Sequence, residues 1–194
     1  GVKKNRATAI KWYKKGAKLG DPLAMVPLGI AYEHGQGIKQ NGKEAAYWYE
    51  AAVETGNEFA PCLLAVIYRD GEALPIDMKR SIYWLRKATE ADYPHSQYEL
   101  GLALRDGDGV KKDQKKAVYW FMKAADQGHI KAQYRLACAF GDGQGVKKDP
   151  KTALYWMLKS AKTGHAPAQN LAGNAYYEGT GIQIDFKKAV HWYR

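Results

Sequence analysis

The stretch that decides the fold is LGLALRDGDGVKKDQKKAVYWFMKAADQGHIKA, residues 100–132. Its tryptophan is one of six, and these six fall at 36-residue steps and account for every Trp in the chain. They are Trp12, Trp48, Trp84, Trp120, Trp156 and Trp192. A fixed period of this length indicates a repeat array, in which each unit buries its apolar face against its neighbours.

The second half of this stretch predicts a helix, which we name helix B of the repeat. Asp113 is of the residue type that caps a helix start, because its carboxylate accepts from unpaired backbone N–H groups. Ala117, Phe121 and Ala124 then recur at helical spacing, with Trp120 on the same face. Gly128 follows where a glycine commonly ends a helix.

A second helix, helix A, is predicted between that glycine and the next glycine-rich turn. Ala132, Leu136 and Phe140 lie at helical spacing, and the run 141–145 ends the helix because its glycines permit left-handed turn conformations. Helix A is predicted over 22–34, 58–70, 94–106, 130–142 and 166–178. Helix B is predicted over 42–55, 78–91, 114–127 and 150–163, with a further helix B at each end of the chain.

Two sets of equivalent positions predict how these helices pack. Small residues recur in helix A at Gly29, Ala65, Gly101, Ala137 and Gly173. They allow helix axes to approach closely, while larger side chains fill the space beside them. The Trp positions are interpreted as core or near-core, with ligand stacking as the alternative.

The pattern L-G-x-x-L-x-x-G-x-G-V-x-x-D-x-x-K-A-x-x-W-F-x-K-A-A-x-x-G-x-x-x-A over residues 100–132 strongly resembles the Sel1-like repeat. Departures are mild: Asp92 replaces the glycine after helix B, Ala73 a loop glycine, and Thr152 a basic residue. The resemblance covers essentially the whole chain. It implies an all-α fold, a right-handed α/α solenoid or superhelix of 36-residue helix-turn-helix units related to tetratricopeptide repeats.

The repeat also predicts the domain organisation. Residues 1–194 are expected to form a single continuous array, with about five full repeats and partial units at both ends. Gly1-Val2 aligns with a loop, Trp192 to Arg194 with the middle of helix B, and neither end carries a capping repeat. We therefore expect a fragment of a longer chain. No apolar run reaches the roughly 18 residues of a membrane span.

The formal net charge is +10, and lysines recur at the start of helix B. These are Lys43, Lys79, Lys115, Lys151 and Lys187, with Lys111, Lys112, Lys116, Lys147, Lys148 and Lys188 nearby. One interpretation is a solvated edge that keeps the array soluble. The alternative is attraction to an acidic partner, a polyanion or a lipid surface.

The two cysteines, Cys62 and Cys138, fall at non-equivalent positions two repeats apart, too far for the roughly 7 Å limit of a disulfide. They are interpreted as apolar fillers or groove residues. A nucleophile motif is absent, and the five histidines form neither an i, i+4 pair nor H-E-x-x-H. No catalytic residue, metal or cofactor is predicted, and the chain is expected not to be an enzyme.

The remaining candidate site is the face of helix A that the packing positions leave free, and the likeness to tetratricopeptide solenoids implies that it lines a concave groove. Its residues vary between repeats, as expected of a surface that meets different parts of a partner. They are Val26, Ile30, Glu33, Cys62, Val66, Arg69, Tyr98, Leu102, Arg105, Tyr134, Cys138, Asn170, Asn174 and Tyr177. Tyr98 and Tyr134 are expected to contribute to binding without contributing to packing.

This face predicts a scaffold or adaptor that binds a peptide or protein partner. The basic edge would favour an acidic partner. A glycan- or cell-envelope-binding module is the alternative, since Tyr98, Tyr134 and Asn170 suit carbohydrate. A nucleic-acid-binding solenoid is disfavoured, because the lysines gather on the loop edge and not in the helix-A face. The resemblance suggests a bacterial protein, with periplasmic, secreted and cytoplasmic locations all open.

Overall fold

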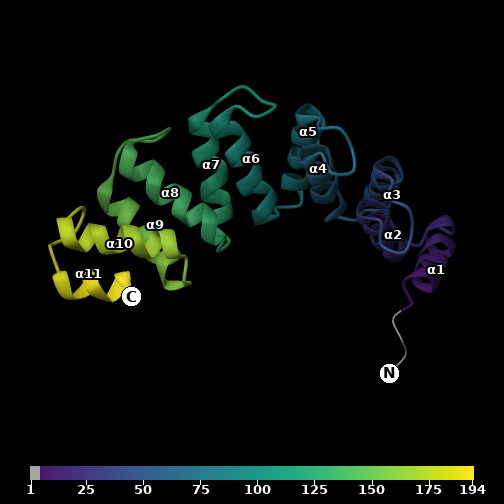
Figure 1. Cartoon of the computed structure of the whole chain (residues 1–194). Helices are drawn as coiled ribbons and strands as arrows, with labels where there is room; N and C mark the ends of the chain where they lie inside the picture. The colour runs from purple at the N-terminus through teal and green to yellow at the C-terminus, as the bar shows by residue number, and fades with distance from the viewer. Residues whose placement is uncertain (1–4) are drawn as a thin grey trace. The chain divides into compact units, whose positions relative to one another are not determined.

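The computed structural model describes residues 5–194, and these residues form eleven helices with no strand (Figure 1). The helix-A segments are α2 (Pro22–His34), α4 (Ala60–Asp70), α6 (Pro94–Asp106), α8 (Ile130–Asp142) and α10 (Ala166–Glu178). The helix-B segments are α1 (Arg6–Lys18), α3 (Gly42–Glu54), α5 (Met78–Glu90), α7 (Gln114–Asp126), α9 (Pro150–Lys162) and α11 (Phe186–Tyr193). The predicted all-α architecture is confirmed.

The predicted helix ends agree closely with the structure, and the main difference is at α4. That helix begins at Ala60 and not at residue 58. The Asn57 side chain forms a turn there, accepting from the backbone N–H groups of Phe59 and Ala60 at 3.0 and 2.9 Å. Each complete helix B ends one residue earlier than predicted, because the residue after it already belongs to the turn.

The loops between helix A and helix B all close in the same way. A left-handed glycine follows helix A, as at Gly107 with φ of 89°. The backbone N–H of Asp113 then donates to the carbonyl of Leu104 at 2.7 Å, and its carboxylate caps α7 by accepting from the Lys116 N–H at 3.0 Å. The same closure recurs at Asn41, Asp77, Asp149 and Asp185. The recurring Gly and Asp positions therefore set the geometry of the hairpin.

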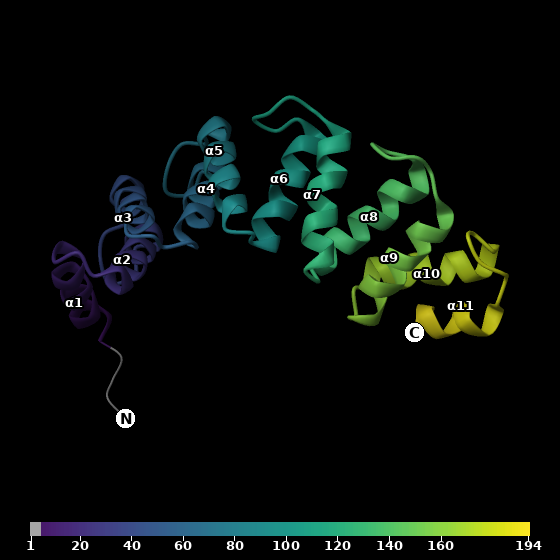
Figure 2. The ribbon, with the colours of Figure 1, turned by 180° about the vertical axis from the view of Figure 1, so that it is seen from behind.

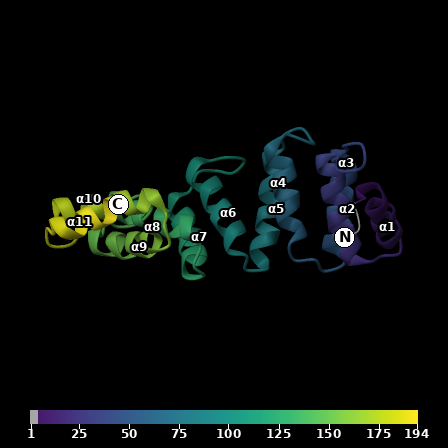
Figure 3. The same ribbon diagram turned by 60° about the horizontal axis from the view of Figure 1, so that its bottom comes forward.

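The contacts divide the chain into two compact units, Gly1–Ala91 and Asp92–Arg194. In unit 1, the fully buried side chains include Leu28, Tyr49 and Leu64. Its hairpin loops lie along one edge, and the α3–α4 connection lies at the opposite edge (Figure 3). In unit 2, Leu100, Phe121 and Leu136 are buried, and α11 lies beside α10 at the C-terminal end (Figure 2).

The recurring small residues of helix A match the size of the side chain opposite them. A Cβ added at Gly101 would lie 2.6 Å from the ring of Phe121, so only glycine fits against that ring. Gly29 and Gly173 face the rings of Tyr49 and Tyr193 in the same way. Where helix A has Ala65 or Ala137, the equivalent helix-B positions hold Leu85 and Met157. Glycine is thus paired with aromatic residues and alanine with aliphatic ones.

The interpretation of the tryptophans as core holds for part of the set. Trp48 and Trp156 are buried, while Trp84, Trp120 and Trp192 are half-buried. Trp12 is 65% exposed, so the prediction is wrong there. Trp48 belongs to a cluster with Met25 of its own helix A. The position equivalent to Met25 for Trp12 falls before residue 1, outside the chain.

Candidate functional site

The predicted site residues differ in burial. Cys62 and Tyr98 are buried, and the rest of the helix-A face is more open. Val26, Ile30, Glu33, Val66, Arg69, Leu102, Arg105, Tyr134 and Cys138 are half-buried, and Asn170, Asn174 and Tyr177 are exposed. The two cysteines are not bonded to each other. All eleven lysines at and near the start of helix B are exposed, which agrees with both interpretations of that edge.

The expectation that Tyr98 takes no part in packing is wrong. Its ring is only 6% exposed and lies 4.6 Å from the His129 ring and 6.0 Å from the Phe121 ring, measured between centroids. His129 belongs to the turn before the next helix A, and this turn covers the beginning of α6. The Tyr134 ring lies likewise 5.0 Å from His165 but stays half-buried.

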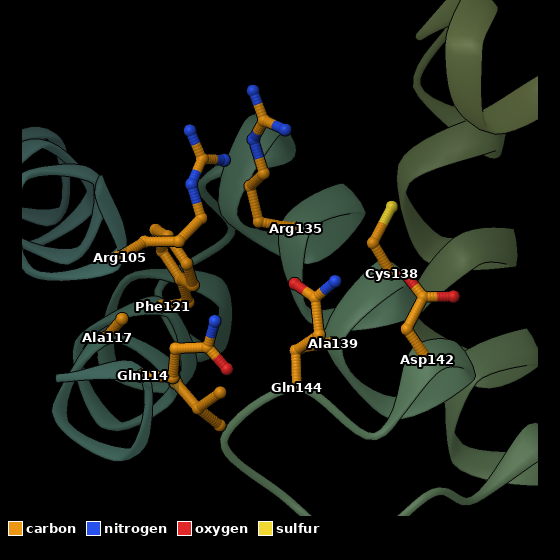
Figure 4. Close-up of a pocket in the computed structure, with 10 residues that line it drawn as sticks. Arg105, Gln114, Ala117, Phe121, Arg135, Cys138, Ala139, Asp142 and Gln144 are labelled. Carbon is orange, nitrogen blue, oxygen red and sulfur yellow. The ribbon is translucent and has the colours of Figure 1, made fainter. Parts of the chain in front are cut away.

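A pocket opens in unit 2 where the ends of α6 and α8 meet α7, and we call it the first pocket (Figure 4). Its volume is about 270 Å³. The apolar wall comes from Ala117, Val118, Phe121 and Ala139, and the polar groups are Arg105, Gln114, Arg135, Cys138, Asp142 and Gln144. The side chains of Arg105 and Arg135 extend to the same side of it, from different repeats.

A second pocket of about 400 Å³ lies one repeat further on, between α8, α9 and α10. Cys138 and Asp142 line both pockets, so the two are neighbours across α8. The second pocket is more apolar. Its lining residues are Tyr134, Ala137, Cys138, Gly141, Asp142, Lys148, Pro150, Ala153, Leu154, Met157, Leu171, Ala175 and Thr180.

The two pockets are built from equivalent positions of successive repeats, and four substitutions account for most of their different chemistry, one of them Pro150 in place of Gln114. Gly141 stands where the first pocket has Arg105, and Leu171 stands where it has Arg135. Thr180 replaces Gln144. Since the backbone geometry repeats, these side chains change a site rimmed by arginines into one that suits an apolar group.

The two arginines of the first pocket differ in their partners. Arg105 donates from Nε and Nη2 to the two carboxylate oxygens of Asp106, at 2.7 and 2.6 Å. This bidentate pair raises the pKa of Arg105 and lowers that of Asp106. Among residues 5–194, Arg135 and Asp142 form no ion pair. The Arg135 guanidinium lies 5.8 Å from the Tyr134 ring centroid.

Cys138 lies at the junction of the two pockets. Burial raises the pKa of its thiol, and the opposing effects of the hydrogen bond from the Tyr134 hydroxyl and the charge of Arg135 are smaller. Burial likewise raises the pKa of Tyr134. The thiol is therefore mainly protonated near neutral pH and is not an activated nucleophile.

Unit 1 contains a pocket at the equivalent position, between α2 and α4, with opposite charge. Its volume is about 230 Å³, and Glu33, Asp70 and Glu72 surround an apolar floor that includes Ile30 and Val66. Glu33 accepts a hydrogen bond from the Tyr49 hydroxyl at 2.5 Å. The desolvation of Tyr49 and this neighbouring carboxylate both raise the pKa of the phenol strongly. The pocket of unit 1 is thus lined from the same repeat positions as the first pocket of unit 2, but by different side chains.

Sequence reasoning proposed one helix-A face, of which Arg105 and Cys138 line the first pocket, Tyr134 and Cys138 the second, and Ile30, Glu33 and Val66 the pocket of unit 1. It missed Arg135, which lies next to the packing residue Leu136. A signal was available, because the equivalent residues Pro27, Leu63, Glu99 and Leu171 vary as widely as those of the predicted face. It also missed Gln114 and Phe121, since helix B was assigned to packing alone.

His129 is expected to make folding depend on pH. Its Nδ1 accepts from the backbone N–H of Ala132 at 3.2 Å and so caps α8. Burial, then the charges of His95 and Lys131, lower its pKa from 6.5 to about 4. Because the unfolded chain takes up this proton first, the stabilisation is complete above pH 6.5 and is lost as the pH falls toward 4.

The matched variant is His129→Asn, since Asn57 at the equivalent position accepts from the backbone N–H of Ala60 and does not titrate. Between pH 7 and 4.5, the wild type should lose about 2 kcal/mol more unfolding free energy than the variant, allowing for solvent screening. Urea unfolding at both pH values measures the difference. Equal losses in the two proteins would show that His129 is not the titrating group.

The side chains that line the pockets are of the kinds found at binding surfaces. Within residues 5–194, no group of three His, Cys, Asp or Glu side chains is placed to hold a metal ion. The pockets instead combine apolar walls with arginine, amide and carboxylate groups, which is the chemistry of recognition surfaces. In the same part of the chain, no helix is both long and apolar enough to cross a membrane.

Comparison with known proteins agrees with this fold. The Sel1 repeat profile matches residues 1–21, 22–57, 60–93, 94–129, 130–165 and 166–194. A solved protective antigen of uropathogenic Escherichia coli strains, displaying an SLR fold, is 31% identical with a TM-score of 0.92. That match covers 97% of this chain and 40% of the antigen, so the chain spans less than half of that relative.

Two further structures extend the comparison. A Sel1 repeat protein of Oxalobacter formigenes is 29% identical over 97% of this chain and 83% of its own, with a TM-score of 0.85. An immunity protein of Pseudomonas aeruginosa, Pa5087, is 20% identical over 95% and 70% with a TM-score of 0.54, which shows likeness of fold alone. No curated protein matches the chain.

Sel1 repeat proteins are generally non-catalytic scaffolds for protein interactions. The profile matches cover nearly every residue, and the helices, caps and hairpin loops repeat with the period of the tryptophans. The chain therefore belongs to the Sel1 repeat family and has its α-solenoid fold.

Proposed function

We propose that this protein is a non-enzymatic scaffold that binds an extended peptide segment of a partner protein on the helix-A face of unit 2. The observation that carries the proposal is the pair of neighbouring pockets between successive repeats. Both open at the ends of helix-A segments, and α8 contributes to both. An extended segment crossing α8 could place one side chain in each pocket.

The repeat pattern supports this use of the surface. The positions that hold the fold together are nearly constant, as in the Asp caps and the left-handed glycines. The pocket-lining positions 105, 135 and 144 change chemistry from repeat to repeat. A scaffold needs this separation, because constant residues maintain the backbone while variable ones select the partner.

The test uses a displayed library of random linear peptides, selected on the immobilised chain. Cys138 provides the control, since the chain has only two cysteines and Cys62 is buried. In a Cys62→Ala background, alkylation of Cys138 with a bulky maleimide should block both pockets. We expect enriched peptides to lose binding by about tenfold or more after this alkylation. Failure to enrich any peptide, or enrichment unaffected by alkylation, would contradict the proposal.

A further inference from the structure

Arg135 and Asp142 point to a particular kind of segment. We propose that unit 2 recognises a peptide segment in which an acidic side chain is followed, about three residues on, by an apolar side chain. The carboxylate binds at Arg135 and Arg105 in the first pocket, and the apolar side chain enters the second. The inference rests on the proposed function and adds the chemistry of the partner.

Arg105 and Arg135 differ in whether their charge is already paired. Asp106 already occupies two N–H groups of Arg105, whereas Arg135 forms no ion pair within residues 5–194. The two guanidinium groups extend to one side of the pocket (Figure 4). A half-buried guanidinium without an ion-pair partner is suited to a carboxylate, since charge-assisted hydrogen bonds are about twice as strong as neutral ones. Asp106 is paired with Arg105, and Asp142 forms no ion pair with Arg135 although both line the pocket, so we assign the carboxylate that pairs with Arg135 to the partner.

The charges around the two pockets also favour a negatively charged partner. In residues 92–194, Lys and Arg outnumber Asp and Glu by 16 to 10. Exposed lysine pairs stand in the two hairpin loops beside the pockets, at Lys111-Lys112 and Lys147-Lys148. Lys148 also lines the second pocket. This excess of positive charge attracts an acidic segment and speeds its association, while the arginines fix the position of the bound segment.

The second pocket is suited to an apolar side chain. Met157, Leu154 and Leu171 line the second pocket, and Gly141 leaves room where the first pocket has an arginine. A Cβ added at Gly141 would meet only the Cβ of Ala153, at 3.9 Å. The volume of about 400 Å³ accepts a side chain as large as leucine or phenylalanine.

The spacing follows from the repeat geometry. Cys138 and Asp142 of α8 line both pockets, so the pockets are separated by about the width of one helix, roughly 10 Å with its side chains. A polyproline II segment advances about 3.1 Å per residue with three residues per turn, which places residues three apart on one side at about 9 Å. Asp142, between the pockets, can accept a backbone N–H of the bound segment.

The experiment measures fluorescence anisotropy with labelled synthetic peptides that contain Glu-x-x-Leu, Lys-x-x-Leu or Glu-x-x-Ser in one common frame. The Glu-x-x-Leu peptide should bind tightest, and Arg135→Glu should weaken it by about 10- to 100-fold. The same variant should improve binding of the Lys-x-x-Leu peptide. Lys123→Glu, an equal charge change on the exposed surface of α7, should have little effect on either.

The second pocket has its own pair of variants. Gly141→Arg copies Arg105 and should fill the pocket beside Asp142, so the Glu-x-x-Leu and Glu-x-x-Ser peptides should bind with equal affinity. Gly141→Ala should keep the preference for leucine. If Arg135→Glu does not fold by circular dichroism, Arg135→Gln replaces it and should cost about tenfold.

The outcomes separate the two proposals. If library peptides bind and Cys138 alkylation blocks them, but neither the glutamate nor Arg135 matters, the scaffold proposal survives and the acidic–apolar specificity is wrong. If the Lys-x-x-Leu peptide binds the wild type as well as Glu-x-x-Leu does, the role assigned to Arg135 is wrong. If no library peptide binds at all, both proposals fail.

Discussion

Replacing Trp156 with alanine is expected to lower the free energy of unfolding by about 3–5 kcal/mol. The side chain is only 7% exposed, so the substitution removes a large apolar surface and leaves a cavity that the neighbouring helices fill incompletely. Urea unfolding followed by circular dichroism measures the change without depending on tryptophan fluorescence.

Trp12→Ala is the matched control, because it removes the same side chain from an equivalent position that is 65% exposed. Its cost should stay within about 1 kcal/mol. The loss of unfolding free energy for Trp120→Ala, at a half-buried position, should lie between those for Trp12→Ala and Trp156→Ala. Equal losses for Trp156→Ala and Trp12→Ala would mean that burial does not distinguish the positions, and the core assignment would have to be abandoned. Since repeats stabilise their neighbours, the damage at Trp156 should extend to α8 and α10.

The second large effect is expected from Gly101→Ala, which should destabilise the protein by about 1–3 kcal/mol. The added Cβ would lie 2.6 Å from Cε1 of Phe121, and the ring cannot move without disturbing α7. In most helical positions this substitution is favourable by about 1 kcal/mol, because alanine loses less backbone entropy. The predicted sign therefore depends mainly on the ring, since the next neighbour, the carbonyl oxygen of Ala117, would lie 3.3 Å from the added Cβ.

Phe121→Met supplies the test, since it reproduces the pairing of Ala137 with Met157 found in the next repeat. In the Phe121→Met background, Gly101→Ala should become neutral or stabilising. A double-mutant cycle from four denaturation curves gives the coupling, which should exceed about 1 kcal/mol. If Gly101→Ala lowers the free energy of unfolding by the same amount in both backgrounds, then the Phe121 ring does not explain why glycine occupies position 101.

The helix boundaries could be predicted because their signals are local. Asp113 caps α7 through its own carboxylate, and Gly143 ends α8 with φ of 76°. Even the departure at Asp92 is local: the residue keeps the left-handed φ of 57° of the glycine it replaces. Its carboxylate accepts from Gln97 Nε2 at 2.6 Å, which holds the turn in place. These features can therefore be predicted from the sequence of a single repeat.

The candidate site could be predicted only in part, because its contacts join different repeats. Its sequence spacing places Tyr98 on a helix face that packing was expected to leave free. Only the contact with His129, in the following turn, shows that the Tyr98 ring is covered. Arg135 and Arg105 come from different repeats, and no pattern within one repeat brings them together. Periodicity defines equivalent positions, but it does not tell which side chain of the next repeat lies over them.

A ladder of exposed tyrosines on helix B offers the main competing surface. Tyr119 and Tyr155 are 54% and 53% exposed, and each ring stacks edge-on against the tryptophan that follows it. These residues lie on the opposite helix of the repeat and line neither pocket of unit 2. A partner bound there would leave Arg135 and Cys138 untouched.

The most direct test of peptide binding at the two pockets is a titration of the isotope-labelled protein with the tightest selected peptide, followed by amide chemical shifts. We expect saturable shifts concentrated along the pocket-lining parts of α6, α8 and α10, including Arg105, Arg135 and Asp142. The amides of Tyr119 and Tyr155 should move little. Shifts concentrated around those two tyrosines, with Arg135 and Asp142 unmoved, would contradict the account and place the partner on helix B.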